Sequence, residues 1–339
     1  MGALTLGIVV PSPSLNLGSR PSPATTSVED ANRPWLSEER RSSVDLMGAA
    51  QALGMGVQLL RVPSHGDPSL VSTMLAQHFG HAGLDRLIVA AHGPAGGSGK
   101  FHAAARACGL PVLGPPAEVI AAAYDKLLAR QRLAFNNLPV PRTLALPHPD
   151  VSAMDRDFDR IGWPCVLKPR HGASGVGVQP IRDRSELDAR LPRADHRSLE
   201  PDMLLERRVS GREVSVVVLD GELLGMIEIT REFDAHGSQV RQMTCPPQLD
   251  ASQRAGLANL GRRACRTLGL TRGPARVDLI LSGRDNEVIL EVEPLPPVHR
   301  ASVVARVARA EGISYPELCA RIITGAHTHS TLAPRSVAG

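Results

Sequence analysis

The stretch from 275 to 293 decides the fold: Ala275-Arg276-Val277-Asp278-Leu279-Ile280-Leu281, a turn around Gly283, then Glu287-Val288-Ile289-Leu290-Glu291-Val292-Glu293. Two apolar runs around a Gly-containing turn predict two strands paired as a hairpin, Ala275 to Leu281 and Glu287 to Val292. Side chains two positions apart on a strand point the same way, so Arg276 shares a face with Asp278, and Glu291 with Glu293. Across the hairpin, three carboxylates and one guanidinium therefore come together.

Three carboxylates in one place imply a counter-cation, because like charges repel one another. Mg²⁺ takes hard oxygen ligands and commonly bridges carboxylates to phosphates of a substrate. Asp278, Glu291 and Glu293 are therefore candidate Mg²⁺ ligands, with Mn²⁺ as the alternative ion. The competing interpretation is a solvated hairpin with ordinary ion pairs, but the apolar neighbours Leu279 and Ile289 favour burial.

Lysine is rare in this chain: only Lys100, Lys126 and Lys168 stand among 38 basic residues, and the rest are arginine. A position that keeps lysine is a candidate for a role that needs a compact, flexible ammonium. Lys126 follows Asp125 at the start of an expected helix, and Lys168 closes an apolar strand before a Gly-rich loop. Surface lysines are the alternative; the neighbouring carboxylate and glycine loops favour phosphate binding.

The Gly-rich loop reads Gly172-Ala173-Ser174-Gly175-Val176-Gly177-Val178. Small residues let backbone N–H groups approach an anion closely. The lysine precedes the glycines, so this is not a Walker A loop. Further along, Glu206 ends an apolar strand and could hold a purine edge, and Glu213 could take ribose hydroxyls. Taken alone these two acids are better explained as exposed charges.

Size and composition narrow the class of protein. A chain of 339 residues, 42% hydrophobic and 21% charged, indicates a globular protein of two or three domains. A net charge of +4, scattered basic residues and 3% aromatics argue against a nucleic-acid partner. The five cysteines lack CxxC spacing and indicate reduced thiols of a cytoplasmic protein. We expect no membrane span and no signal peptide.

The order of elements changes along the chain. In the first third, expected strands alternate with helices and predict a parallel sheet covered on both faces: Leu4 to Val10, Val57 to Val62 and Leu84 to Ala91, with helices Ser42 to Leu53, Pro68 to Phe79 and Phe101 to Cys108. One helix is expected from Ala117 to Phe135. After Met203, the turn Asp220-Gly221 predicts antiparallel strands, and helices are expected at Ser252 to Leu268, Ser302 to Glu311 and after Ser314.

In their order and spacing these motifs resemble the ATP-grasp enzymes, and within them the D-alanine–D-alanine ligase family. The likeness covers about residues 80 to 325 well and the first 80 weakly. The matching stretches include His92 to Lys100, Asp125-Lys126, Lys168-Pro169 with Gly172 to Val178, Leu205-Glu206 with Gly211-Arg212-Glu213, Ala275 to Asp278, Glu291 to Glu293 with Leu295-Pro296, and Gly312 to Tyr315.

The resemblance implies an α/β fold, α+β in its C-terminal half, with three subdomains. These would be an N-terminal parallel-sheet domain (1–118), a central lobe (119–208) and a C-terminal lobe (209–330) that clasp ATP, followed by a tail (331–339). It also implies an ATP-dependent carboxylate–amine ligase that joins two amino acids through an acyl phosphate, a cytoplasmic homodimer acting in peptidoglycan biosynthesis. Its partners would be small amino-acid substrates.

The resemblance also implies roles for individual residues. Lys126 and Lys168 would hold phosphates, Glu206 and the backbone near Val209 adenine, and Glu213 the ribose. Arg276 and Ser174 would be the catalytic residues. The family's Ser-x-Glu-x-x-x-Ser motif can be placed at Ser37 to Ser43, so Glu39 would bind the ammonium of the first amino acid. The alternative for Glu39 is an exposed acid at a helix start. The expected substrate-binding residues are Glu39, His92, Arg276 and Ser302.

Four departures from the family pattern concern the metal, the acceptor site and the lid. Glu293 stands where the family has a metal-binding asparagine, and Pro297 where it has a glycine, so a backbone N–H donor is absent there. The lid, about Thr230 to Thr244, lacks the family's lysine and tyrosine, with Arg231 or Arg241 as candidate replacements. Pro11 to Pro34 replaces a short glycine turn.

Three hypotheses follow from these observations. The first is a ligase that makes a D-alanine–D-alanine-like dipeptide. The second is a divergent ATP-grasp ligase or cyclase that acts on another amino acid in specialised metabolism. The third is a non-catalytic nucleotide-binding homologue. Lys126, Lys168, Asp278 and Glu291 argue against the third, because a binder without turnover has little need of a complete metal cluster.

Overall fold

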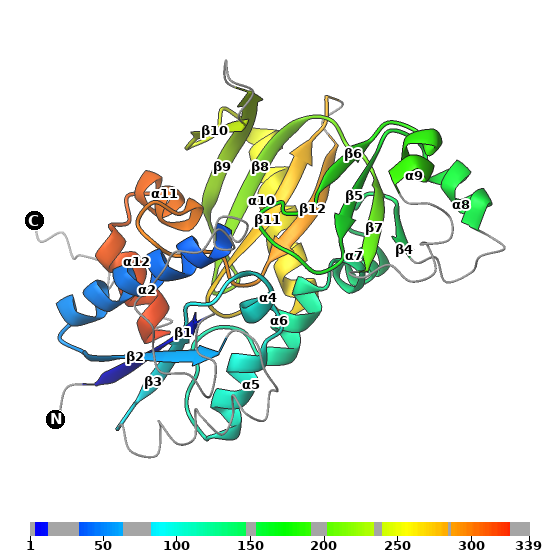
Figure 1. Ribbon diagram of the computed structural model, residues 1–339. Coiled ribbons are helices and arrows are strands. Elements are labelled where there is room, and N and C mark those ends of the chain that lie inside the picture. Colours follow the sequence, from blue (N-terminus) through cyan, green and yellow to red (C-terminus); the bar gives the residue numbers. More distant parts are fainter. Residues whose placement is uncertain are drawn as a thin grey trace, which may run out of the picture.

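The computed structural model describes residues 4–12, 34–63, 83–146, 154–190, 202–233, 239–283 and 286–325. Its strands form three separate sheets of three, four and five strands. Figure 1 shows the three-stranded sheet at one end of the molecule, the four-stranded sheet at the other end and the five-stranded sheet between them. In the described part of the chain no helix is both long enough and apolar enough to cross a membrane.

The first sheet is parallel, in the order β2-β1-β3, with β1 at Thr5–Ser12, β2 at Gly56–Pro63 and β3 at Arg86–Val89. Successive side chains of β1 point to opposite faces of this sheet, and both faces are buried. Leu6 and Ile8 pack with helix α2 (Pro34–Ala52), whereas Val9 packs with helix α5 (Lys100–Ala107). The predicted parallel sheet with two covered faces is confirmed.

The helices next to the first sheet differ in part from those predicted. Helix α2 begins at Pro34, eight residues before the predicted start at Ser42. Of the loop predicted at Pro11 to Pro34, Pro11 belongs to β1 and Pro34 to α2, and 13–33 lie outside the described residues. The predicted helix at Pro68 to Phe79 lies outside the described residues. In the Gly-rich turn of the short helix α4 (Gly93–Gly97), a Cβ on Gly97 would lie 2.3 Å from the ring of Tyr124. Glycine there allows the turn to pack directly on the aromatic ring.

The prediction of one continuous helix from Ala117 to Phe135 is wrong, whereas the helix start expected at Lys126 is confirmed. The structure has two helices, α6 (Ala117–Tyr124) and α7 (Lys126–Phe135), separated at Asp125. Asp125 has extended backbone angles, φ −72° and ψ 101°, and its side chain accepts hydrogen bonds from the backbone of Leu127 and Leu128. An acid that caps a helix N-terminus competes with helix continuation, and helical periodicity across the break concealed that competition.

The second sheet is antiparallel, in the order β4-β7-β5-β6. Its strands are β4 (Thr143–Leu146), β5 (Cys165–Pro169), β6 (Gln179–Ile181) and β7 (Met203–Arg207). Helices α8 (Met154–Ile161) and α9 (Arg184–Arg190) contribute Phe158 and Leu187 to its core. This lobe places Lys168 near the end of β5 and Glu206 on the neighbouring strand β7.

The third sheet is antiparallel, in the order β10-β9-β8-β11-β12. Its strands are β8 (Arg212–Leu219), β9 (Glu222–Phe233), β10 (Gln239–Thr244), β11 (Pro274–Leu281) and β12 (Glu287–Glu293). The predicted hairpin at Asp220-Gly221 joins β8 to β9, and the hairpin of β11 and β12 is also confirmed. A shift in the register of β11 against β12 falls between Asp278 and Leu279, so the pairing is irregular beside the acidic residues.

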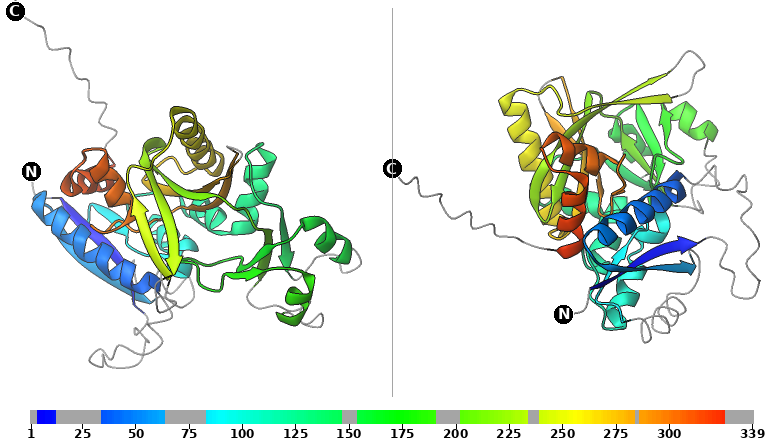
Figure 2. Two further views of the ribbon diagram at one scale, coloured as in Figure 1. Left: turned by 90° about the horizontal axis from the view of Figure 1, so that it is seen from above. Right: turned by 90° about the vertical axis from the view of Figure 1, so that its left-hand side faces the viewer.

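Helices cover both faces of the third sheet and connect it to the rest of the molecule. Helix α10 (Ala251–Leu268) shares one core with α6, α7, β8 and β11. Helices α11 (Val303–Ala310) and α12 (Tyr315–Thr324) share another core with α2 and β1 of the N-terminal sheet. Figure 2 shows α12 lying beside α2, far from it in sequence. This shared core fixes the N-terminal sheet against the C-terminal lobe.

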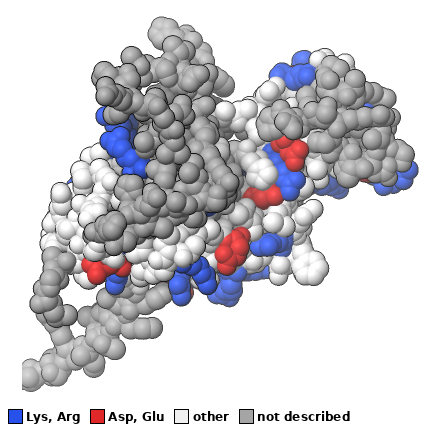
Figure 3. All heavy atoms as spheres, turned by 60° about the horizontal axis from the view of Figure 1, so that its bottom comes forward, with Lys and Arg blue, Asp and Glu red and all other residues white. Residues whose placement is uncertain are grey.

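Two further features complete the fold. The expected lid corresponds to the hairpin of β9 and β10, whose connection at 234–238 lies outside the described residues, as do the side chains of Arg231 and Arg241. On the face drawn in Figure 3, acidic and basic side chains lie next to one another, as the scattered charges of the sequence suggest.

Candidate functional site

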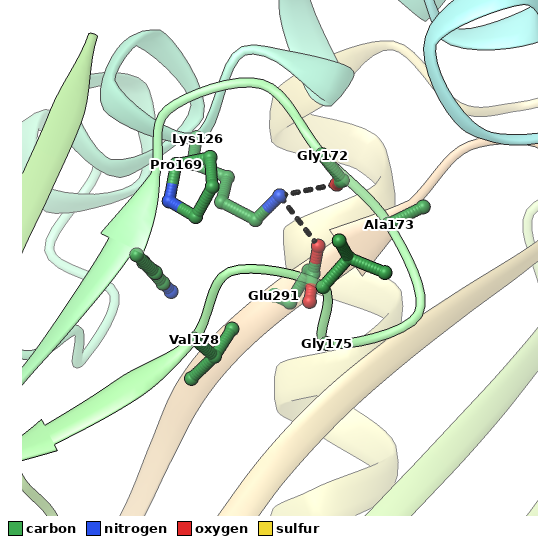
Figure 4. A pocket seen from close by; sticks show the side chains of 9 residues that line it. Lys126, Pro169, Gly172, Ala173, Gly175, Val178 and Glu291 are labelled. Atoms are coloured by element: carbon green, nitrogen blue, oxygen red, sulfur yellow. Dashed lines mark hydrogen bonds and ion pairs between the residues drawn. The ribbon is translucent and has the colours of Figure 1, made fainter. Parts of the chain in front are cut away.

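A cleft lies where the second and third sheets meet. It contains about 270 Å³ of space, part of it open to solvent, and is lined by Lys126, Lys168, Glu291 and the Gly-rich loop. Figure 4 shows the Lys126 ammonium pointing toward Glu291 from beneath this loop. Three segments that are distant in sequence therefore meet here, around 126, 168–178 and 291, and Lys126 and Lys168 line the same cleft.

Lys126 begins helix α7 and is fixed by two oxygen atoms. Its Nζ donates to the carbonyl of Gly172 at 2.5 Å and lies 3.1 Å from Glu291 Oε1. The first contact joins the helix to the Gly-rich loop, and the second joins it to strand β12. Burial alone would raise the pKa of Glu291, but the ammonium groups of Lys126 and Lys168 hold that pKa below its usual value.

Asp125 fixes the base of the same loop. Its carboxylate caps α7 at 3.1 Å from two backbone N–H groups and accepts two hydrogen bonds from Arg170, at 2.9 Å and 2.7 Å. Burial would raise the pKa of Asp125, yet the Arg170 guanidinium and the backbone donors keep it below its usual value. One acid thus sets both the start of the helix that carries Lys126 and the path of the loop after Lys168.

The Gly-rich loop itself adopts left-handed backbone angles at Ser174 (φ 58°), Gly175 (φ 73°) and Gly177 (φ 75°). Such angles are favourable for glycine and costly for other residues. At Gly177 a Cβ would also lie 2.8 Å from the Pro169 ring. Ser174 is exposed at the turn of the loop, and none of the described contacts fixes its hydroxyl.

For the ATP site that the resemblance implies, we predict that Asp125→Ala weakens nucleotide binding more than turnover. The loss of the helix cap should destabilise the protein by about 1 kcal/mol, and the loosened loop should raise KM for ATP by about tenfold with a smaller effect on kcat. Chemical denaturation and initial-rate kinetics measure the two effects. Asp202, which also contacts Arg170 but is more exposed, supplies the matched control Asp202→Ala. An unchanged KM in Asp125→Ala would refute the role given to the loop.

Glu206 is buried next to the cleft residue Lys168 and lies between two cations. Lys168 Nζ is 2.7 Å from Oε2, and Arg130 donates through Nε to Oε1 at 2.9 Å and through Nη2 to Oε2 at 3.0 Å. All three side chains are buried, with exposed fractions of 4% for Glu206, 5% for Arg130 and 8% for Lys168. The sequence analysis missed Arg130. Its position one helical turn after Lys126, on the same face of α7, was the available signal.

Two other residues expected to contact the nucleotide, Val209 and Glu213, follow Glu206 in the chain. Val209 is half-buried in the connection between β7 and β8, and Glu213 is half-buried on β8 next to Ile229 and Ile280. The exposed-charge alternative is therefore wrong for Glu206, which is buried. The roles expected for Val209 and Glu213 stay predictions.

Strands β11 and β12 bring the three predicted metal ligands onto neighbouring positions. Asp278 lies opposite Glu291, and Arg276 lies opposite Glu293. Arg276 binds both carboxylate oxygens of Asp278 at 2.9 Å, and Ser215 Oγ donates to Asp278 at 2.6 Å. Among the described residues no three acid, His or Cys side chains are arranged as a ready metal cluster. Two of the acids are held by cations, Asp278 by Arg276 and Glu291 by Lys126.

Electrostatics distinguish the third acid. Burial raises the pKa of Glu293 to about 7, an effect that the neighbouring Glu291 reinforces and Arg276 opposes. Burial on its own would lower the pKa of Arg276. The negative charges of Asp278 and the two glutamates outweigh this effect and raise the pKa above its usual value, so the guanidinium stays charged. The solvated-hairpin alternative is wrong, because these side chains are partly or largely buried.

A second group of polar side chains lies where α2 meets the loop after β12. Glu39 is 2% exposed, and its Oε1 accepts from the backbone N–H of His92 at 2.8 Å. Its other oxygen, Oε2, is buried and has no hydrogen-bond partner among the described residues. Burial raises the pKa of Glu39 to about 8. The alternative of an exposed helix-start acid is therefore wrong for Glu39.

His92 connects this group to the C-terminal lobe. Its Nδ1 donates to the carbonyl of Leu295 at 2.9 Å, and its Nε2 lies 3.3 Å from Ser42 Oγ. Burial lowers the pKa of His92 to about 4, so the ring is neutral and Nε2 accepts from the serine hydroxyl. Residues of the first helix, the first Gly-rich turn and the loop after β12 therefore meet at one place.

The loop after β12 makes further contacts with α2. His299 pairs with Glu38 next to Glu39, and the backbone N–H of Arg300 donates to Asp45 at 2.8 Å. Ser302 caps helix α11 by accepting from the backbone N–H of Ala305 at 3.2 Å and is buried. Pro297, which has no N–H, lies in the same loop. The sequence analysis did not single out Glu38 and His299.

The sequence of this chain matches those of known ligases. A family model described as D-ala D-ala ligase C-terminus matches residues 137–324. The D-alanine–D-alanine ligase of Anaeromyxobacter sp. (strain Fw109-5) is 32% identical over 250 residues, which are 72% of this chain and 80% of that protein.

Solved structures agree in fold. D-alanine–D-alanine ligase from Bacillus anthracis matches with a TM-score of 0.76 and 18% identity over 95% of this chain and 97% of that one. The same enzyme complexed with ATP matches with a TM-score of 0.75, at the same identity and coverage. The expected ATP-grasp architecture is confirmed. The chain belongs to the D-alanine–D-alanine ligase family of ATP-dependent ligases.

Proposed function

We propose that this protein joins two D-alanine molecules into a dipeptide, with conversion of ATP to ADP and phosphate. Membership of the family supports the reaction class, and the cleft lined by Lys126, Lys168 and Glu291 is the observation that carries the nucleotide site. We further propose a cytoplasmic homodimer that acts in peptidoglycan biosynthesis, as the family likeness implies.

In this proposal the triphosphate lies under the Gly-rich loop. Lys126 of helix α7 and Lys168 of strand β5 line the same cleft, so two ammonium groups can neutralise one polyphosphate. Exposed Val176 and Val178 extend the loop over the cleft and would cover the bound nucleotide. Glu206 would meet the base and Glu213 the ribose.

The acids of β11 and β12 fit a hard divalent cation by the chemistry of their donors. Asp278, Glu291 and Glu293 offer carboxylate oxygens at neighbouring strand positions, and Mg²⁺ prefers such ligands together with phosphate oxygens. The bound ion would neutralise charge on the transferred phosphoryl group. Glu293 in place of an amide adds one negative charge to this donor set. Lys126 and Arg276 hold Glu291 and Asp278 in place.

The first amino acid would bind at Glu39. An acid that is buried, with one oxygen lacking a partner, is costly unless a cationic group meets it. The ammonium of an amino acid supplies that group. His92 fixes the carboxylate from its backbone, and its neutral ring is held between Ser42 and Leu295. Ser302 and Arg276 would then face the second amino acid.

The chemistry needs two steps. A carboxylate oxygen of the first D-alanine attacks the γ-phosphorus of ATP, ADP leaves, and an acyl phosphate forms. The amino group of the second D-alanine then attacks the carbonyl carbon, phosphate leaves, and the nitrogen loses a proton. Arg276 would stabilise the oxyanion formed in this step, and because Pro297 has no N–H, more of that role falls to the guanidinium.

Amino-acid-dependent phosphate release tests the proposal, with the product identified by mass spectrometry. We expect release with D-alanine, none with L-alanine, and a dipeptide in a 1:1 ratio to phosphate. Pro297 and Glu293, which depart from the family pattern, also favour a second candidate, a ligase for another amino acid. Release with a different amino acid, but not with D-alanine, would establish that candidate. No release with any D- or L-amino acid would leave only a nucleotide binder.

We predict that amino-acid binding depends on pH through Glu39. Because the pKa of Glu39 in the free protein is about 8, the carboxyl is mostly protonated at pH 7 and must lose its proton to bind an ammonium. Affinity for D-alanine should therefore rise by up to about tenfold per pH unit below pH 8 and level off above it. Titration calorimetry in buffers of different ionisation enthalpy measures the released proton. In Glu39→Gln the slope should vanish; a slope that persists would assign it to another group.

A further inference from the structure

Arg130 has no role in the site described so far, yet it is the most firmly held side chain in it. Its guanidinium donates to both oxygens of Glu206 and to the carbonyl of Ile289 at 2.6 Å, and it also donates to the carbonyl of Leu290. Arg130 thus joins α7 and β7 to strand β12, next to the acids. A buried guanidinium with four acceptors cannot change position without leaving several of them unpaired.

Lys168 binds the same carboxylate far more loosely. In the described part of the chain its ammonium has one hydrogen-bonding partner, Glu206 Oε2 at 2.7 Å. Its flexible stem lines the cleft, and its charge also acts on Glu291 at the opposite wall. Lys168 can therefore move from Glu206 toward an anion in the cleft while giving up a single contact.

The carboxylate of Glu206 has limited room for a further donor. Each carboxylate oxygen has two lone pairs. Oε2 already accepts from Arg130 and from Lys168. Oε1 accepts from Arg130 at 2.9 Å and from the Thr143 hydroxyl at 3.4 Å, and that hydroxyl also contacts the carbonyl of Pro141 at 3.1 Å. A new N–H donor therefore gains a full hydrogen bond to Oε2 only when Lys168 leaves it.

The charges favour this exchange. Two buried cations share one buried acid, so the group carries an excess positive charge that an anion can offset. Burial and the nearby Arg130 lower the pKa of Lys168, in keeping with a crowded pair of cations. When Lys168 moves to a phosphate, Arg130 alone is left to keep Glu206 ionised and in place.

We propose that Arg130 is a positioning residue that holds the Glu206 carboxylate while Lys168 passes from it to the nucleotide phosphates, so that an amino group of the base takes the vacated position. This inference rests on the proposed nucleotide site. It predicts that recognition of the base and of the phosphates is coupled through one lysine. An adenine offers an amino group to the carboxylate, whereas the guanine carbonyl at the corresponding position would be repelled by it.

Glu206→Gln gives a test in which the two halves of the ligand respond with opposite sign. The amide of this variant holds Lys168 less strongly than the carboxylate does. Inorganic tripolyphosphate should therefore bind to the Glu206→Gln variant about threefold to tenfold more tightly than to the wild type. Adenosine, measured with saturating tripolyphosphate present to draw Lys168 away, should bind about tenfold more weakly, because the charged acceptor is gone. Both affinities are measured by calorimetry with the full chain at one Mg²⁺ concentration. Equal or same-sign changes would overturn the exchange.

A double-mutant cycle tests Arg130. Arg130→Met should lower the ratio of kcat/KM for ATP to that for GTP by about tenfold, and in a Glu206→Gln background it should lower that ratio no further. The double variant removes both charges, so it also guards against loss of folding caused by a buried unpaired acid. The matched control is Arg132→Met, an exposed residue on the same helix, which should leave the ratio unchanged. A further loss of selectivity in the double variant would show that Arg130 does not act through Glu206.

These outcomes separate this inference from the proposed function. If the wild type binds neither ATP nor tripolyphosphate, the nucleotide site itself is wrong. If the wild type binds both but the two Glu206→Gln affinities move together, the site stands and the exchange of Lys168 is wrong.

Discussion

Lys168→Ala is expected to lower kcat/KM for ATP by about a thousandfold or more while the protein still folds, because this lysine supplies one of two ammonium groups that face the triphosphate. Folding should survive, since Arg130 keeps the buried Glu206 paired. Steady-state kinetics at saturating amino acid measure the loss, and circular dichroism and thermal unfolding check the fold.

Two variants sharpen this first prediction. Lys168→Arg keeps the charge but not the compact ammonium, so it should recover only part of the activity. Lys100→Ala is the control, because Lys100 begins α5 outside the lining of the cleft; its activity should stay within about threefold of the wild type. Full activity in Lys168→Ala would remove the basis for placing the triphosphate in this cleft.

Arg276→Met is expected to reduce both activity and stability. It leaves the largely buried Asp278 with Ser215 as its remaining partner, which should destabilise the fold by about 3 kcal/mol. It also removes the donor proposed for the oxyanion, which should lower kcat by at least about a hundredfold. Denaturant unfolding and single-turnover kinetics measure the two losses.

A second substitution separates these effects. In the double variant Arg276→Met with Asp278→Asn, no buried charge is left unpaired, so most of the stability should return. Activity should stay low, because the guanidinium and one proposed metal ligand are both absent. If restoring stability also restored activity, Arg276 would have a structural role only.

The sequence predicted the elements that depend on local patterns. The hairpin of β11 and β12 and the hairpin at Asp220-Gly221 follow from alternating residues and turn signals, and both are confirmed. The parallel N-terminal sheet follows from alternating strands and helices and is also confirmed. The helix start at Lys126 was predicted, but the end of the preceding helix at Tyr124 was missed, because apolar residues continue at helical spacing through Asp125, whose side chain caps the next helix.

In the candidate site, the motif residues could be found and their partners could not. Lys126, Lys168, Glu206 and Glu291 carry charges in recognisable settings, and the structure brings all four together. Arg130 is one arginine among many in the sequence, and its burial depends on α7 packing against β7 and β12. Glu38 and His299 are separated by most of the chain, so their contact requires knowledge of how α2 meets the C-terminal lobe.

The metal prediction shows a different limit. Alternation along two strands correctly places Asp278 opposite Glu291, but it says nothing of which cation each acid binds. In the structure Arg276 and Lys126 hold two of the acids. Proximity of acids can be predicted from strand periodicity, whereas their pairing depends on long side chains from other elements.

The central claim is that a cationic cleft allows ATP to activate an otherwise unreactive carboxylate. Labelled D-alanine with ¹⁸O in both carboxylate oxygens tests it most directly, with the released phosphate analysed by mass spectrometry. If the carboxylate attacks the γ-phosphorus, one labelled oxygen should appear in phosphate for every dipeptide formed. Dipeptide formation with unlabelled phosphate, or ATP cleavage that transfers no label, would contradict the account.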